Sequence, residues 1–233
     1  MLGKPNERHP HSPQGRLLVA LEGPCCAGKT TLAKELARHL LGLAVYVECF
    51  ADHAGGGHCL PKPVPESLEE DAQAMGRLLE VEESRMAPSR LGNTPVIILD
   101  RSVHTFLAHR CAIEQLTGLA CLEPARQILI QSRASAWPNL VIYLDVPQTA
   151  VQDRNNGKFQ TGNILVEPAF NNAFRSYFAE LRSATEPQVA WLDAMRPIQV
   201  LTHAAVSTIR EALANRRSRS NGTSAALRKG GIR

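Results

Sequence analysis

The chain has 233 residues, of which 44% are hydrophobic and 21% charged, a composition that excludes a fibrous or largely disordered protein. Its net charge of +4 originates at one end, because residues 216–233 carry six Lys or Arg side chains and no acidic ones. Subtracting these six charges leaves about −2 for the remaining residues, which excludes the broad basic surface of a nucleic-acid-binding protein.

The spacing of apolar residues predicts alternating strands and helices. In chain order, we expect a strand at 16–22, a helix from Lys29, a strand at 44–48, a helix at 66–86, a strand at 96–99, helices at 102–116 and 123–132, a strand at 140–144, helices at 148–154 and 167–183, a strand at 189–192 and a helix at 203–215. Glycines and prolines between the second strand and the next helix predict a loop there.

This alternation predicts an α/β fold with a five-stranded parallel sheet. Near-continuous apolar strands such as VIIL and LVIYL are typical of a sheet that helices cover on both faces. Residues 15–215 are expected to form one domain. Residues 1–14 are polar and rich in proline, and residues 216–233 lack periodic apolar residues, so we expect both ends to be disordered tails.

A phosphate-binding loop is the most specific motif in the sequence. It fits G-x-x-x-x-G-K-[ST] and lies between a predicted strand and a predicted helix, as this motif requires. Backbone N–H groups of such a loop surround phosphate oxygens, the lysine reaches the terminal phosphates, and the hydroxyl of the following residue ligates Mg²⁺. The expected ATP-binding residues are Gly23, Pro24, Cys25, Cys26, Ala27, Gly28, Lys29, Thr30 and Thr31.

Two predicted strands run directly into an aspartate, Asp100 and Asp145. A phosphate-binding loop needs a carboxylate near the magnesium, and we assign that role to Asp100 together with Thr30. The following Arg101 is a fixed cation that suits a phosphate or a substrate sugar. For Asp145, a capping role at the next turn is an equal alternative.

Glu48 also ends a predicted strand, and the carboxyl ends of parallel strands face the ligand crevice. A carboxylate there is a candidate general base, or a group that orients an attacking hydroxyl. Arg154 and Lys158 belong to a polar stretch that we interpret as a lid over ATP, near residues 153–163, with Arg154 stabilising the transferred phosphoryl group. A solvent-exposed strand end and a mobile surface loop are the alternatives.

Four segments together resemble the thymidylate kinase and deoxynucleoside kinase families of P-loop kinases. They are LEGPCCAGKTTLAKEL, LDRSVHTF, VIYLDVP followed by Arg154, and VAWLDA. The resemblance implies a three-layer αβα sandwich with strand order 2-3-1-4-5, an arginine-containing lid, ATP and Mg²⁺. It also implies a small-molecule acceptor, a nucleoside or a nucleoside monophosphate, and leaves a homodimer open.

The acceptor distinguishes the two families. The resemblance implies that Arg85 reaches the base in a thymidylate kinase and that Glu48 is the base toward a 5′-hydroxyl in a nucleoside kinase, with Arg101 near the substrate in both. The sequence departs from both patterns at Glu48-Cys49, where a Glu-Pro pair is common. Cys25 and Cys26 replace an acidic residue found in many thymidylate kinases.

Other functions remain as alternatives to this interpretation. A kinase for another hydroxylated metabolite, such as an antibiotic, would keep the same ATP site, and a P-loop ATPase switch would have no acceptor except water. No apolar run approaches the ~20 residues that span a bilayer. The six cysteines have no metal-ligand spacing. We therefore expect a cytoplasmic enzyme with no nucleic-acid or membrane partner.

Overall fold

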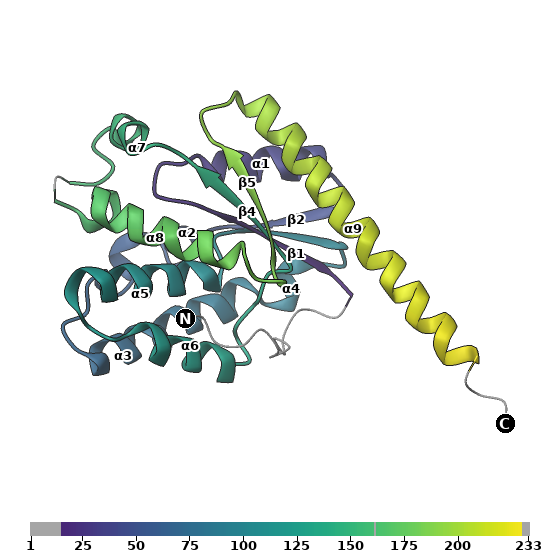
Figure 1. Ribbon diagram of the computed structural model, residues 1–233, viewed down its shortest axis with the longest axis horizontal. Helices are drawn as coiled ribbons and strands as arrows, with labels where there is room; N and C mark the ends of the chain where they lie inside the picture. The colour runs from purple at the N-terminus through teal and green to yellow at the C-terminus, as the bar shows by residue number, and fades with distance from the viewer. Residues whose placement is uncertain (1–14, 161, 230–233) are drawn as a thin grey trace.

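The computed structural model describes residues 15–160 and 162–229, with side chains of the last helix described as far as residue 218. Its centre is a five-stranded sheet in the order β2-β3-β1-β4-β5 (Figure 1). All neighbouring strands are parallel. The strands are β1 (Leu17–Glu22), β2 (Ala44–Val47), β3 (Val96–Asp100), β4 (Leu140–Asp145) and β5 (Gln188–Asp193). The predicted fold and strand order are confirmed.

Helices cover both faces of this sheet, and alternate residues of each strand supply the two cores. Leu18 and Ala20 of β1 face one core, while Leu17, Val19 and Leu21 face the other. The helices are α1 (Lys29–His39), α2 (Phe50–His53), α3 (Leu68–Arg85), α4 (Pro88–Leu91), α5 (Val103–Thr117), α6 (Leu122–Gln131), α7 (Gln148–Asn155), α8 (Pro168–Leu181) and α9 (Ile198–Lys229), with short 3₁₀ turns at Gly57–Cys59 and Ile164–Val166. Helices α3, α5, α6 and α8 cover the first core, and α1 and α9 cover the second.

The last helix differs from our expectation. We predicted that the ordered chain ends at Asn215, but α9 continues to Lys229 and projects beyond the sheet (Figure 1). Residues 218–224 read SRSNGTS and have low helix propensity, so propensity does not explain the extension, although lengthening an existing helix avoids the cost of nucleation. The predicted tail at 1–14 and the final residues 230–233 lie outside the described residues.

Four short elements escaped prediction. Helices α2 and α4 and the two 3₁₀ turns each have three or four residues, which is too short for a periodic pattern to show. Helix α2 follows the carboxyl end of β2, where Glu48 lies, and the side chain of Arg90 on α4 reaches Glu48. The residues expected to form a loop after the second strand therefore fold partly into helical turns next to the site.

Candidate functional site

The phosphate-binding loop connects the end of β1 to the start of α1. Gly23 has φ of 136°, and a Cβ atom at this position would lie 2.6 Å from the carbonyl oxygen of Leu144 on β4. Gly28 has φ of 92° and forms the N-cap of α1. Both glycines are therefore required by the backbone itself, which turns tightly between strand and helix and directs the start of α1 toward the loop.

Lys29 folds back onto the loop. Its Nζ donates to the carbonyl oxygens of Gly23 at 3.1 Å and Pro24 at 2.6 Å, and the residue is only 6% exposed. Burial, followed by the positive charge of Arg101, lowers the pKa of Lys29 to about 8. The ammonium group is thus held by two carbonyl oxygens within the loop, from which rotation of the side chain would bring it to a bound phosphate.

Thr30 and Asp100 meet beside the loop. The Thr30 hydroxyl donates to Oδ2 of Asp100 at 2.5 Å, across 70 residues of sequence. Asp100 is 1% exposed, and its Oδ1 has no hydrogen-bond partner among the described residues. A hydroxyl and a buried carboxylate oxygen with an unused acceptor are hard oxygen ligands of the kind Mg²⁺ prefers, so this pair fits the ion.

The second strand-end aspartate has a different partner. Asp145 accepts two hydrogen bonds from Arg175, at 2.8 and 2.9 Å, and the arginine also lies over the ring of Trp191. This pairing ties the end of β4 to α8. The structure therefore brings Asp100, rather than Asp145, to the hydroxyl of Thr30.

Arg101 lies against the phosphate-binding loop. Its guanidinium donates to the carbonyl oxygen of Gly23 at 3.4 Å and approaches the sulfur of Cys25 at 3.5 Å. Its φ of 71° is unusual for a residue with a side chain. This backbone conformation aims the cation at the loop, which is a placement suited to a phosphate that the loop holds.

A buried glutamate fixes that conformation, and sequence reasoning missed it. Glu22 is fully buried and accepts hydrogen bonds from the backbone N–H of Ser102 at 2.9 Å, from the Ser102 hydroxyl at 2.7 Å and from the Thr105 hydroxyl at 2.6 Å. Burial raises the pKa of Glu22, whereas these hydrogen bonds and the nearby Arg101 oppose that increase. The signal available was a carboxylate that directly precedes Gly23 in an otherwise apolar strand.

The remaining residues of the motif shape the loop. Cys26 has φ of 62°, so it contributes to the turn of the loop. Burial and then the neighbouring Cys25 raise the pKa of its thiol, and the Lys158 charge acts in the opposite direction. Lys158 of the expected lid is thus close enough to act on the loop. Pro24 and Ala27 are buried, and Thr31 is exposed on α1.

Glu48 lies directly after β2 and is bound on two sides. Its Oε1 accepts from His53 Nδ1 at 2.9 Å and from Arg90 Nη2 at 2.6 Å, and its side chain is 36% exposed. The hydrogen bond from His53 is the main cause that lowers the pKa of Glu48. Residues of α2 and α4, two elements that sequence reasoning did not predict, therefore hold this carboxylate.

Arg85 is a buried clamp in this structure. It is fully buried, pairs with Glu82 at 2.5 Å, and donates to the carbonyl oxygens of Glu48 at 2.8 Å and Arg101 at 2.8 Å. We expected it to contact an acceptor, but its guanidinium is committed to the backbone. Local spacing on α3 does not reveal this role, because the partner carbonyls lie at the ends of β2 and β3.

Arg154 points away from the loop toward the end of β5. It donates to the carbonyl oxygen of Ala194 at 3.0 Å and approaches the sulfur of Met195 at 3.6 Å. Its expected contact with the transferred phosphoryl group would require the carboxyl end of α7, which contains Arg154, to move. Residue 161, within the predicted lid, lies outside the described residues.

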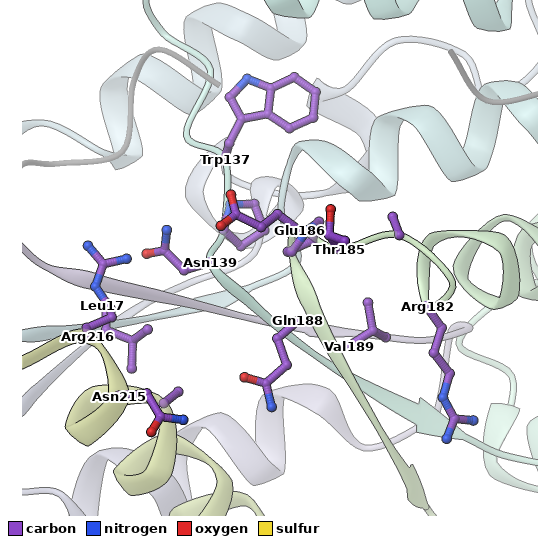
Figure 2. Close-up of a pocket in the computed structure, with 14 residues that line it drawn as sticks. Leu17, Trp137, Asn139, Arg182, Thr185, Glu186, Gln188, Val189, Asn215 and Arg216 are labelled. Atoms are coloured by element: carbon purple, nitrogen blue, oxygen red, sulfur yellow. The ribbon is translucent and has the colours of Figure 1, made fainter. Parts of the chain in front are cut away.

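A cavity of about 560 Å³ lies at the amino ends of the strands, opposite the phosphate-binding loop (Figure 2). It is lined by residues near the amino ends of β1, β4 and β5, including Leu17, Asn139 and Gln188, and by Arg216 of α9. Since the phosphate-binding loop follows the carboxyl end of β1, this cavity is remote from the site above.

Within residues 15–160 and 162–229, no helix is both long and apolar enough to cross a bilayer. The same part of the chain contains no cluster of three or more His, Cys, Asp or Glu side chains suited to a metal ion. A Mg²⁺ ion that ATP brings does not need such a cluster, because phosphates and water supply most of its ligands.

Comparison with known proteins shows the fold. No protein-family model and no curated protein sequence matches the chain. Among solved structures, deoxyadenosine kinase from M. mycoides, with the products dCMP and dCDP bound, matches with a TM-score of 0.59 and 13% identity, covering 84% of this chain and 100% of that chain. Thymidylate kinase from Candida albicans matches with a TM-score of 0.61 and 17% identity, covering 84% and 92%. The chain thus shares its fold with the deoxynucleoside and thymidylate kinases.

Proposed function

We propose that this protein is an ATP- and Mg²⁺-dependent phosphotransferase that transfers the γ-phosphoryl group to a nucleoside or a nucleoside monophosphate. The hydrogen bond between Thr30 and Asp100, beside the phosphate-binding loop, is the observation that carries the proposal. A hydroxyl and a carboxylate that are far apart in sequence meet where the terminal phosphates of a loop-bound ATP would lie. The fold shared with nucleoside and nucleotide kinases supports the same class of reaction.

The chain's own groups suit distinct parts of this reaction. The loop would bind the phosphates through its backbone N–H groups, and Lys29 would exchange its two carbonyl partners for phosphate oxygens. Thr30 and Asp100 would hold Mg²⁺, which neutralises charge on the β- and γ-phosphates when bound. Arg101 would stabilise negative charge on the transferred group.

The carboxyl end of α7 and the stretch that follows it would close over ATP. Lys158 already acts electrostatically on Cys26 of the loop, whereas Arg154 is bound to the carbonyl oxygen of Ala194. Release of that contact would allow Arg154 to reach the γ-phosphate. Such closure excludes water and therefore favours transfer to the acceptor over hydrolysis.

The proposal is tested by measuring ADP formation with MgATP against nucleosides, nucleoside monophosphates and hydroxylated metabolites such as aminoglycosides. We expect turnover to require an acceptor, and Lys29→Ala to lower kcat at least ~100-fold because it removes a cation from the transferring phosphoryl group. Lys34→Ala, on the same helix, is the control. Turnover that no acceptor changes would instead indicate a P-loop ATPase.

A further inference from the structure

Three charged or titratable side chains, which we call the acceptor edge of the site, are hydrogen-bonded to one another at the end of β2, and ATP binding does not require them. Glu48, His53 and Arg90 come from the end of β2, from α2 and from α4, and both contacts to the carboxylate involve Oε1. Among the described residues, no hydrogen bond reaches Oε2. One oxygen of Glu48 is thus fixed by two donors, and the other is left to accept a hydrogen bond from a bound molecule.

His53 is itself held in one orientation. An ionised carboxylate only accepts, so Nδ1 must carry the proton in its bond to Glu48. Nε2 lies 3.0 Å from the hydroxyl of Ser84 on α3. With the proton of the neutral ring on Nδ1, Nε2 accepts a hydrogen bond from this hydroxyl. The histidine is 12% exposed, so packing as well as hydrogen bonding limits its movement. This chain from Ser84 through His53 gives the Glu48 carboxylate a defined direction.

The arginines around this edge are already paired. Arg85 is bound to Glu82 and to backbone carbonyl oxygens, Arg90 is bound to Glu48, and Arg101 lies on the phosphate-binding loop. Burial is the main cause that raises the pKa of Tyr46, and Asp100, Cys49, Asp52 and Glu48 add to the increase. Binding a phosphate dianion here would require breaking an ion pair, whereas a neutral hydroxyl requires only an acceptor.

We propose that His53 and Arg90 are positioning residues that keep Glu48 ionised and oriented, and that the acceptor site consequently selects an uncharged hydroxyl over a phosphate monoester. This inference rests on the proposed kinase function and identifies its acceptor class, a nucleoside-like alcohol. Glu48 Oε2 takes the hydroxyl proton as the acceptor oxygen bonds to the γ-phosphorus. The bond between that phosphorus and the β,γ-bridging oxygen breaks, and ADP leaves with the electron pair.

The charged and titratable groups that act on this arrangement come from several elements. The hydrogen bond from His53 is the largest cause that lowers the pKa of Glu48, burial opposes it, and Arg90 and Arg85 lower it further. Glu82 interacts with His53 across the α2–α3 contact. Removal of His53 therefore raises the Glu48 pKa toward its ordinary value. Because the base acts in its ionised form, the acidic limb of the pH–rate profile should then move to higher pH.

The experiment measures kcat and kcat/KM between pH 4.5 and 8.5 with nucleosides and their 5′-monophosphates as paired acceptors. Nucleosides should be the better acceptors, and Glu48→Gln should lower kcat with them by ~100-fold or more. His53→Ala should lower kcat roughly tenfold and move the acidic limb upward, with an unchanged KM for ATP. His53→Asn, whose amide N–H replaces Nδ1–H, should restore most of kcat and return the acidic limb close to its wild-type pH. Glu83→Gln and His203→Ala, at exposed positions, are the matched controls.

Three results would overturn the inference. Preferential phosphorylation of monophosphates would refute the acceptor class and leave the kinase assignment intact. An acidic limb that His53→Ala and His53→Asn both leave in place would refute the positioning role. ATP binding without transfer to either class of acceptor would refute the proposed function together with the inference.

Discussion

The two edges of the site are built in different ways. On the ATP side, one segment of eight residues supplies the loop, the lysine and the hydroxyl, and the adjacent Asp100 and Arg101 come from the end of β3. On the acceptor side, Glu48 is bound by α2 and α4, and Arg85 reaches it from α3. A single segment can keep the same ATP chemistry in many proteins. The acceptor side is assembled from four elements, so a substitution in any one of them can change the substrate.

Replacing the buried Arg85 should cause the largest change, which is a loss of stability. Arg85→Met leaves Glu82 fully buried without its partner and frees the carbonyl oxygens of Glu48 and Arg101. Urea denaturation should show a loss of ~3–5 kcal/mol. Adding Glu82→Gln should recover part of it, and Arg77→Met, exposed on the same helix, should change stability little. A loss below ~1 kcal/mol for Arg85→Met would show that the clamp does not hold this edge.

The ATP side is tested at Asp100, which lies 70 residues from its partner Thr30. Asp100→Asn should lower kcat by ~10²–10³-fold and raise the Mg²⁺ concentration needed for half-maximal turnover, because it removes the negative charge beside Thr30. The control is the same substitution at Asp145, whose ion pair with Arg175 is half exposed and contributes ~0–1 kcal/mol. Equal effects at the two aspartates would contradict the assignment of the metal site.

A smaller effect concerns pH. With the pKa of Lys29 lowered to about 8, the ligand-free side chain loses its charge as pH rises through that value. MgATP needs the charged form, so its Kd should stay constant below pH 7.5 and then rise, by up to ~tenfold per pH unit, above pH 8. Calorimetric titration measures this. Lys29→Arg stays charged and should show no such rise, and a wild-type Kd that is flat to pH 9.5 would refute the mechanism.

Periodicity predicted the alternating strands and helices, the resemblance to the kinase families implied the strand order, and both are confirmed. The GKT motif is a local signal, and the structure places it between β1 and α1 as the sequence predicts. The sequence favoured Asp100 over Asp145 because Arg101 follows Asp100, and the metal role of Asp100 remains a prediction. Sequence reasoning missed the roles of Glu22, His53 and Arg90 and did not foresee the burial of Arg85, since each depends on contacts across 37 to 80 residues or on helices of four residues. The length of α9 was also missed, because residues 216–229 have neither a periodic apolar pattern nor a consistently high helix propensity.

The most direct test of the central claim is the stoichiometry of the reaction, followed by ³¹P NMR with MgATP and a nucleoside acceptor. We predict that ADP and the phosphorylated acceptor appear in equal amounts, with inorganic phosphate only as a minor product. ADP that accumulates together with an equal amount of inorganic phosphate, whatever acceptor is present, would contradict a phosphotransferase and indicate that water is the acceptor.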